Sequence, residues 1–141
     1  MRAFLDTSVL IATFYGDHEH HTESLNLFLR FDKKDACGSG YSLAEVYSVL
    51  TGMPGRSRVS GDEALLFLTN VRERLTLITL NDQEYFDAVE SAAAAKVVGG
   101  GIYDALLGHC ALKVNAERIF TWNVKHFKCL SPEIGARVTM P

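Results

Sequence analysis

The first twelve residues, Met1–Ala12, read M-R-A-F-L-D-T-S-V-L-I-A and decide how the fold is built. A short apolar run ends at Asp6, and a second apolar run begins after Thr7 and Ser8. We expect a buried strand over residues 1–6 and a helix over 8–14, capped by Thr7 or Ser8. An acid at such a junction lies at the carboxyl end of a strand, and ligands of open α/β sheets bind at that edge.

The remaining chain continues to alternate strands with helices. We predict strands over 36–41, 75–80 and 118–122, with an edge strand over 136–139. Helices are predicted over 17–30, 42–52, 62–74, 82–98 and 102–114, with Ser42 and Asp82 as caps and Glu45 in capping-box register with Ser42. This order predicts an α/β fold whose mostly parallel central sheet has helices on both faces.

Size and composition indicate an ordinary globular protein. The chain has 141 residues, 48% of them apolar and 22% charged, which predicts a single domain over 1–141. No apolar run suits a membrane span or a signal peptide, so we expect a cytoplasmic protein without membrane contact. Three widely spaced cysteines argue against disulfides and structural zinc. The net charge of −3 argues against broad, non-specific nucleic-acid binding, but it leaves room for RNA at a local basic rim.

Three further residues occupy junctions comparable to that of Asp6. Glu45 lies in the expected first turn of a helix after a strand, Asp104 lies in the first turn after three glycines, and Asn123 follows a strand. If the strands are parallel, all these positions meet at one edge of the sheet. Mg²⁺ prefers oxygen ligands, so the set predicts a metal site that hydrolyses phosphodiesters. Taken singly, each has an ordinary alternative, because the helix dipole favours acids in the first turn and Asn is common in turns.

Four stretches in chain order resemble the motifs of a known family. They are F-L-D-T-S-V-L-I-A at 4–12, S-L-A-E-V-Y-S-V-L-T at 42–51, I-Y-D-A-L-L-G-H-C-A at 102–111 and F-T-W-N-V-K-H-F at 120–127. The chain resembles PIN-domain ribonucleases, and among them the VapC-type toxins of bacterial type II toxin–antitoxin systems. The resemblance covers Met1 to about Leu130. It implies a three-layer α/β/α fold, a homodimer, a cognate antitoxin, and an endoribonuclease that uses Mg²⁺, for which Mn²⁺ may substitute.

The resemblance also assigns roles to residues. It implies that Asp6 and Asp104 hold the metal and that Glu45 completes the set or helps to deprotonate the attacking water. It implies that Asn123 positions a water or a second ion. Hydroxyls that could support these groups belong to Thr7, Ser8 and Thr121, and side chains that could contact RNA belong to Arg56, Arg58 and Lys125. For Arg56 and Arg58, solvated loop charges are an equal alternative.

The chain departs from the family pattern in its last motif. That motif often supplies a fourth acid, either at the Asn123 position or three residues later, and this chain has Asn123 and His126 there. An alternative function is therefore a catalytically silent PIN-like domain that binds RNA or a protein. A third alternative, an aspartyl-phosphate enzyme built on Asp6, would need an acid two residues later, where this chain has Ser8.

Overall fold

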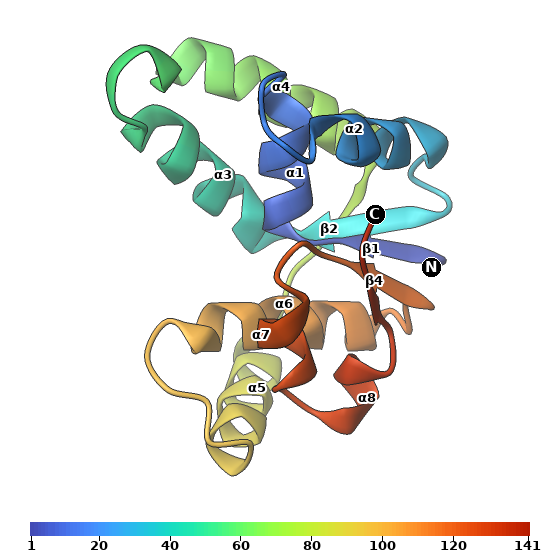
Figure 1. Ribbon diagram of the computed structural model, residues 1–141. Helices are drawn as coiled ribbons and strands as arrows, with labels where there is room; N and C mark the ends of the chain where they lie inside the picture. Colours follow the sequence, from blue (N-terminus) through green and yellow to red (C-terminus); the bar gives the residue numbers. More distant parts are fainter.

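Five short strands form one parallel sheet in the centre of the molecule, and the computed structural model describes residues 1–141 (Figure 1). The sheet order is β3-β2-β1-β4-β5, and every neighbouring pair is parallel. This arrangement confirms the predicted parallel sheet. The strands are β1 (Ala3–Leu5), β2 (Ala36–Ser39), β3 (Thr76–Ile78), β4 (Arg118–Phe120) and β5 (Val138–Thr139).

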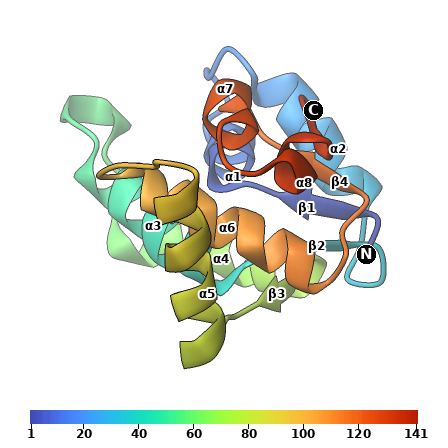
Figure 2. The same ribbon diagram turned by 90° about the horizontal axis from the view of Figure 1, so that it is seen from below.

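Helices cover both faces of the sheet (Figures 1 and 2). One face carries α1 (Thr7–Phe14), α2 (His21–Arg30), α3 (Gly40–Gly52) and α4 (Gly61–Arg74), with a short 3₁₀ turn at Gly55–Ser57 before α4. The opposite face carries α5 (Asp82–Ala94), α6 (Gly101–Lys113), α7 (Val124–Lys128) and α8 (Pro132–Gly135). The predicted three-layer α/β/α architecture is therefore confirmed. None of the helices combines the length and the apolar character that a membrane span requires.

The sheet separates two hydrophobic cores, because successive strand side chains point to opposite faces. Within β1, Ala3 and Leu5 pack among the helices α1–α4, whereas Phe4 packs in the second core with residues of α6 and α7. All three are fully buried. All three cysteines are free thiols; Cys37 and Cys110 are buried, and Cys129 is exposed.

Three helix caps differ from the sequence predictions. The N-cap of α1 is Asp6 instead of Thr7 or Ser8, and the N-cap of α5 is Asn81 instead of Asp82. The capping box predicted for Ser42 and Glu45 is also wrong, because α3 begins at Gly40 with Ser39 as its cap. Each observed cap is the polar residue nearest the strand end whose side-chain oxygen reaches a free N–H of the first turn.

Two further helix boundaries differ from the predictions. Helix α5 ends at Ala94, four residues before the predicted end at 98, and α2 begins at His21 instead of Asp17. The backbone beyond α5 turns left-handed at Lys96 and Gly99, with φ angles of 59° and 56°. A left-handed residue cannot continue a right-handed helix, so the chain reverses there before α6 begins.

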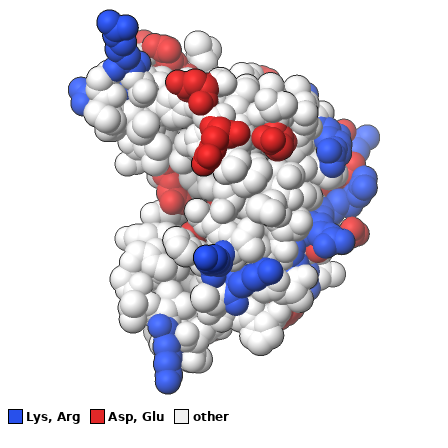
Figure 3. Space-filling view, in the orientation of Figure 1, with Lys and Arg blue, Asp and Glu red and all other residues white.

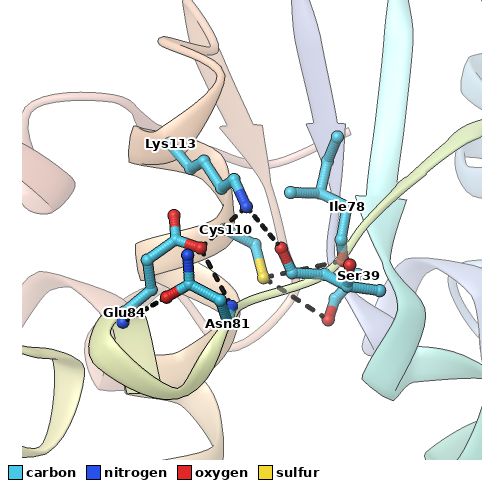
Figure 4. Close-up of polar contacts among 7 residues, drawn as sticks. Ser39, Ile78, Asn81, Glu84, Cys110 and Lys113 are labelled. Atoms are coloured by element: carbon cyan, nitrogen blue, oxygen red, sulfur yellow. Dashed lines mark hydrogen bonds and ion pairs between the residues drawn. The ribbon is translucent and has the colours of Figure 1, made fainter. Parts of the chain in front are cut away.

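Polar contacts fix α6 against the ends of two strands (Figure 4). Lys113 Nζ donates to the Thr79 carbonyl and to Glu84 Oε1, each at 2.8 Å. One turn earlier, Cys110 Sγ lies 3.6 Å from Ser39 Oγ. These contacts hold the second half of α6 over the carboxyl ends of β2 and β3. The first turn of α6, with Asp104, therefore lies beyond the carboxyl edge of the sheet (Figure 1).

Candidate metal centre at the carboxyl edge of the sheet

The candidate site lies where the strand order reverses. From β1 the chain proceeds to β2 and β3 on one side of the sheet and later to β4 and β5 on the other side. In open α/β sheets this reversal creates a crevice at the carboxyl ends of the two central strands. Asp6 directly follows β1 and Thr121 directly follows β4, so both lie in this crevice.

Asp6 is the buried centre of the site, with only 2% of its surface exposed. Its Oδ2 accepts hydrogen bonds from Ser8 Oγ and Thr121 Oγ1, both at 2.7 Å. The two hydroxyls are themselves oriented, because Ser8 Oγ accepts the Trp122 N–H at 3.0 Å and Thr121 Oγ1 accepts the Asn123 N–H at 2.9 Å. Burial raises the pKa of Asp6, while the hydroxyl donors act in the opposite direction.

Glu45 approaches the site from α3. The Thr7 hydroxyl donates to Glu45 Oε1 at 2.9 Å and lies 2.8 Å from Ser42 Oγ. Because α3 begins at Gly40, Glu45 is in the second turn of that helix and not in the first turn predicted from the sequence. Burial raises the pKa of Glu45, and the negative charges of Asp6 and Asp104 raise it further.

Asp104 reaches the site from the first turn of α6, as the sequence predicts. Its side chain is 24% exposed, and its Oδ2 lies 3.5 Å from His126 Nδ1 on α7. Burial raises the pKa of Asp104, and so does the charge of Asp6, whereas His126 lowers it. The crevice therefore contains three carboxyl groups from three separate elements, and each of these groups holds its proton more tightly than usual.

No cationic side chain from lysine or arginine neutralises these acids, since His126 is the only basic residue in an ion pair with any of them. Figure 3 shows a notch between the two halves of the molecule with acidic atoms inside it and basic atoms on the lower half of the same face.

No three His, Cys, Asp or Glu side chains converge closely enough to hold one ion directly. Mg²⁺ usually binds one or two carboxylates and keeps several waters, so the donor set fits a hydrated divalent cation.

The other residues singled out in the sequence lie at varying distances from this centre. Asn123 is exposed before α7, and only its backbone joins the network, through Thr121. Lys125 is exposed on α7. Arg56 and Arg58 are exposed in the loop between α3 and α4, where Arg58 Nε donates to the Met53 carbonyl at 3.0 Å. The structure therefore brings the three acids and their hydroxyl partners together and leaves both loop arginines away from them.

Comparisons with known proteins identify the family of the chain. The sequence model of the PIN domain matches residues 3–128. The chain belongs to the PIN-domain family. Ribonuclease VapC27 of Mycobacterium tuberculosis is 31% identical over 113 residues, which span 80% of this chain and 79% of that protein.

Solved structures show the same PIN fold. Mycobacterium tuberculosis VapC20, described as a toxin that cleaves the sarcin-ricin loop, superposes with a TM-score of 0.72 at 14% identity, over 88% of this chain and 92% of that one. VapBC2 of Rickettsia felis, bound to a DNA fragment from its promoter, gives a TM-score of 0.68 at 18% identity, over 99% of this chain and 98% of the other. The family resemblance read from the four motifs is thereby confirmed.

The structure of this PIN domain also reveals neighbours of the acids that the sequence did not single out. Tyr41 on α3 and Tyr103 on α6 stack with nearly parallel rings, 5.4 Å between centroids. Burial raises the pKa of Tyr41, and the charge of Glu45 raises it further. Tyr103 directly precedes Asp104, but the crossing of two helices that creates the pair leaves no local signal in the sequence.

The burial of Asp104, together with the nearby charge of Asp6, predicts an effect on the stability of this PIN domain. Because the pKa of Asp104 is raised on folding, the folded state binds protons more tightly and loses stability as pH rises above the ordinary aspartate value of about 4. We expect metal-free Asp104→Asn to unfold at a higher temperature than the unaltered protein at pH 7, with the gain shrinking toward pH 4. Thermal unfolding in EDTA at several pH values measures this gain, and a variant that melts lower at pH 7 would contradict it.

Proposed function

We propose that this PIN-domain chain is a metal-dependent endoribonuclease, the toxin of a toxin–antitoxin pair. It hydrolyses RNA phosphodiester bonds in the cytoplasm at the site of Asp6, Glu45 and Asp104, and residues 1–141 form one domain. The observation that carries the proposal is the set of three carboxyl groups in one crevice, with raised pKa values and no lysine or arginine paired to them. Such a set is costly to a fold unless a cation binds it.

A divalent cation bound here supplies charge stabilisation for the phosphate and makes a water easier to deprotonate. We assign the cation to Asp6 and Asp104, each acting directly or through a water, and Glu45 completes the set. Mg²⁺ is the expected ion, and Mn²⁺ can substitute. Asp6 is suited to this role because two hydroxyl donors fix its Oδ2 and define the direction of the carboxylate.

Glu45 is the residue best placed to accept the proton of the attacking water. Its raised pKa brings it closer to neutral pH, where a general base works best. The Thr7 hydroxyl fixes Oε1 and so orients the carboxylate toward the crevice. Asn123 is exposed, and its backbone N–H bonds to Thr121, so we assign its amide to positioning a water or a second ion.

We assign the contacts with the RNA substrate to basic residues on the surrounding surface. Lys125 follows Asn123 by two residues and is exposed, so its ammonium group can pair with an RNA phosphate beside the cut. Arg56 and Arg58 can contact RNA farther along the strand or contact a protein partner. We further assign a cognate antitoxin and a homodimeric state to this chain, supported by its similarity to VapC and VapBC proteins.

The proposal is tested by incubating purified, antitoxin-free protein with total RNA and with tRNA in Mg²⁺, in Mn²⁺ and in EDTA. We expect cleavage with either metal and none in EDTA. A folded protein that binds metal and RNA but cuts neither substrate under any condition would contradict the proposed endoribonuclease activity. It would favour the catalytically silent PIN-like domain that binds RNA.

A further inference from the structure

We propose that His126 binds the cation of this site through its imidazole, next to Asp104, and that the site therefore prefers Mn²⁺ to Mg²⁺. The inference rests on the proposed function, since it concerns the same metal centre. It starts from the position of His126, three residues after Asn123, which brings its imidazole beside Asp104.

Asp104 is the carboxylate most available to a cation. Asp6 accepts two hydroxyl donors and Glu45 accepts one. By contrast, the one polar partner of Asp104 is His126, whose Nδ1 lies 3.5 Å from Oδ2. A cation that binds Asp104 through Oδ2 therefore lies beside this nitrogen or displaces it.

The separation of the two atoms suits shared ligation. Two adjacent donors on an octahedral ion, each bonded at roughly 2.1–2.2 Å, lie about 3 Å apart. The observed 3.5 Å needs only a small rotation of the imidazole, which is 70% exposed. Its backbone is held firmly, because the next residue, Phe127, is fully buried in the second core.

The other histidines lie elsewhere in the fold. His18, His20 and His21 belong to the segment before and at the start of α2, where His20 stacks on Trp122 with 3.7 Å between ring centroids. His109 is on α6 with Asp104, but it lines a separate cavity between α5, α6 and α8. His126 is thus the one imidazole paired with an acid of the crevice.

A nitrogen donor changes the metal preference in a predictable direction. Mg²⁺ is a hard cation that favours oxygen ligands and gains little from imidazole. First-row transition ions accept imidazole readily, with affinity rising from Mn²⁺ through Co²⁺. A site with Asp104 and His126 as direct ligands should therefore bind Mn²⁺ more tightly than Mg²⁺. The difference between the two affinities should depend on His126.

The test measures metal binding by the full chain without RNA. Mn²⁺ and Mg²⁺ are titrated into EDTA-treated protein by calorimetry, and bound Mn²⁺ is examined by pulsed electron paramagnetic resonance for coupling to ¹⁴N. We expect ¹⁴N coupling in the unaltered protein and none in His126→Ala, whose Mn²⁺ affinity falls about tenfold or more. Mg²⁺ affinity should change less than about twofold. His109→Ala is the matched control and should behave as the unaltered protein.

Two results would overturn the inference. One is bound Mn²⁺ without ¹⁴N coupling; the other is an equal loss of Mn²⁺ and Mg²⁺ affinity in His126→Ala. Asp104→Asn separates this failure from failure of the proposed function. If Mn²⁺ binding depends on Asp104 but shows no nitrogen, only the role of His126 is wrong. The proposed metal centre is wrong too if the unaltered protein binds neither ion. It is also wrong if Asp104→Asn binds both ions with the affinity of the unaltered protein.

Discussion

Replacing Asp104 by Asn should lower RNA cleavage by about a thousandfold or more while the protein stays folded. The amide has nearly the same shape as the carboxylate, but it lacks the negative charge that binds a divalent cation. Asp104 is the acid with the fewest competing hydrogen bonds, so its charge is the one most available to the ion. The measurement is the single-turnover cleavage rate at saturating metal, together with circular dichroism of the variant.

Asp62→Asn is the matched control for this substitution. Asp62 also lies in the first turn of a helix, α4, and its side chain is exposed. Loss of a first-turn acid costs a few tenths of a kcal/mol up to about 1 kcal/mol through the helix dipole. If both variants lost cleavage equally, a general effect on folding would explain the result. An Asp104→Asn protein within tenfold of the unaltered rate would refute the role of Asp104.

Replacing Thr121 by Val should slow cleavage about 10–100-fold and also destabilise the protein. Valine has a similar shape but donates no hydrogen bond to Asp6 Oδ2 and accepts none from the Asn123 N–H. Asp6 is 2% exposed, so water cannot replace the lost donor freely. Leaving a buried acceptor short of a partner costs about 1–3 kcal/mol.

The Thr121→Val prediction is checked by urea unfolding and by cleavage rates across metal concentrations. A misdirected Asp6 should lower the affinity for metal, so half-maximal cleavage should require a higher metal concentration. A purely structural defect would not shift this concentration. Thr69→Val is the control, because Thr69 is exposed and its hydroxyl bonds only to the Leu65 carbonyl of its own helix, at 2.9 Å. Unchanged cleavage in Thr121→Val would mean that the Ser8 hydroxyl alone suffices to orient Asp6.

The sequence predicts the layers of this fold because local patterns determine them. Short apolar runs, which suit strands buried on both faces, alternate along the chain with helices of period 3.6, and this order requires a parallel sheet covered on both faces. Asp6 can be placed at the carboxyl edge for the same reason, since it ends the first apolar run. Helix starts are less determined, because Ser39 and Ser42 are both good caps and only the end of β2 selects Ser39.

The geometry of the site depends on contacts between residues far apart in sequence. Asp104 reaches the crevice because Cys110 and Lys113 fix α6 against strand ends, and no spacing in the sequence encodes that crossing. The closeness of His126 to Asp104 likewise follows from the packing of α7, in which Phe127 is fully buried. Sequence reasoning could identify the acids and their supporting hydroxyls, but it could not identify the contact of His126 with Asp104 or the stacked tyrosines Tyr41 and Tyr103.

The central claim is that the carboxyl groups of this crevice bind a divalent cation. The most direct measurement is anomalous diffraction from crystals of the protein soaked in Mn²⁺, recorded for the unaltered chain and for Asp104→Asn. We predict an anomalous peak at ligand distance from Asp104, in the crevice with Asp6 and Glu45, that disappears in the variant. No peak in the crevice, or one that persists without the Asp104 charge, would contradict the claim.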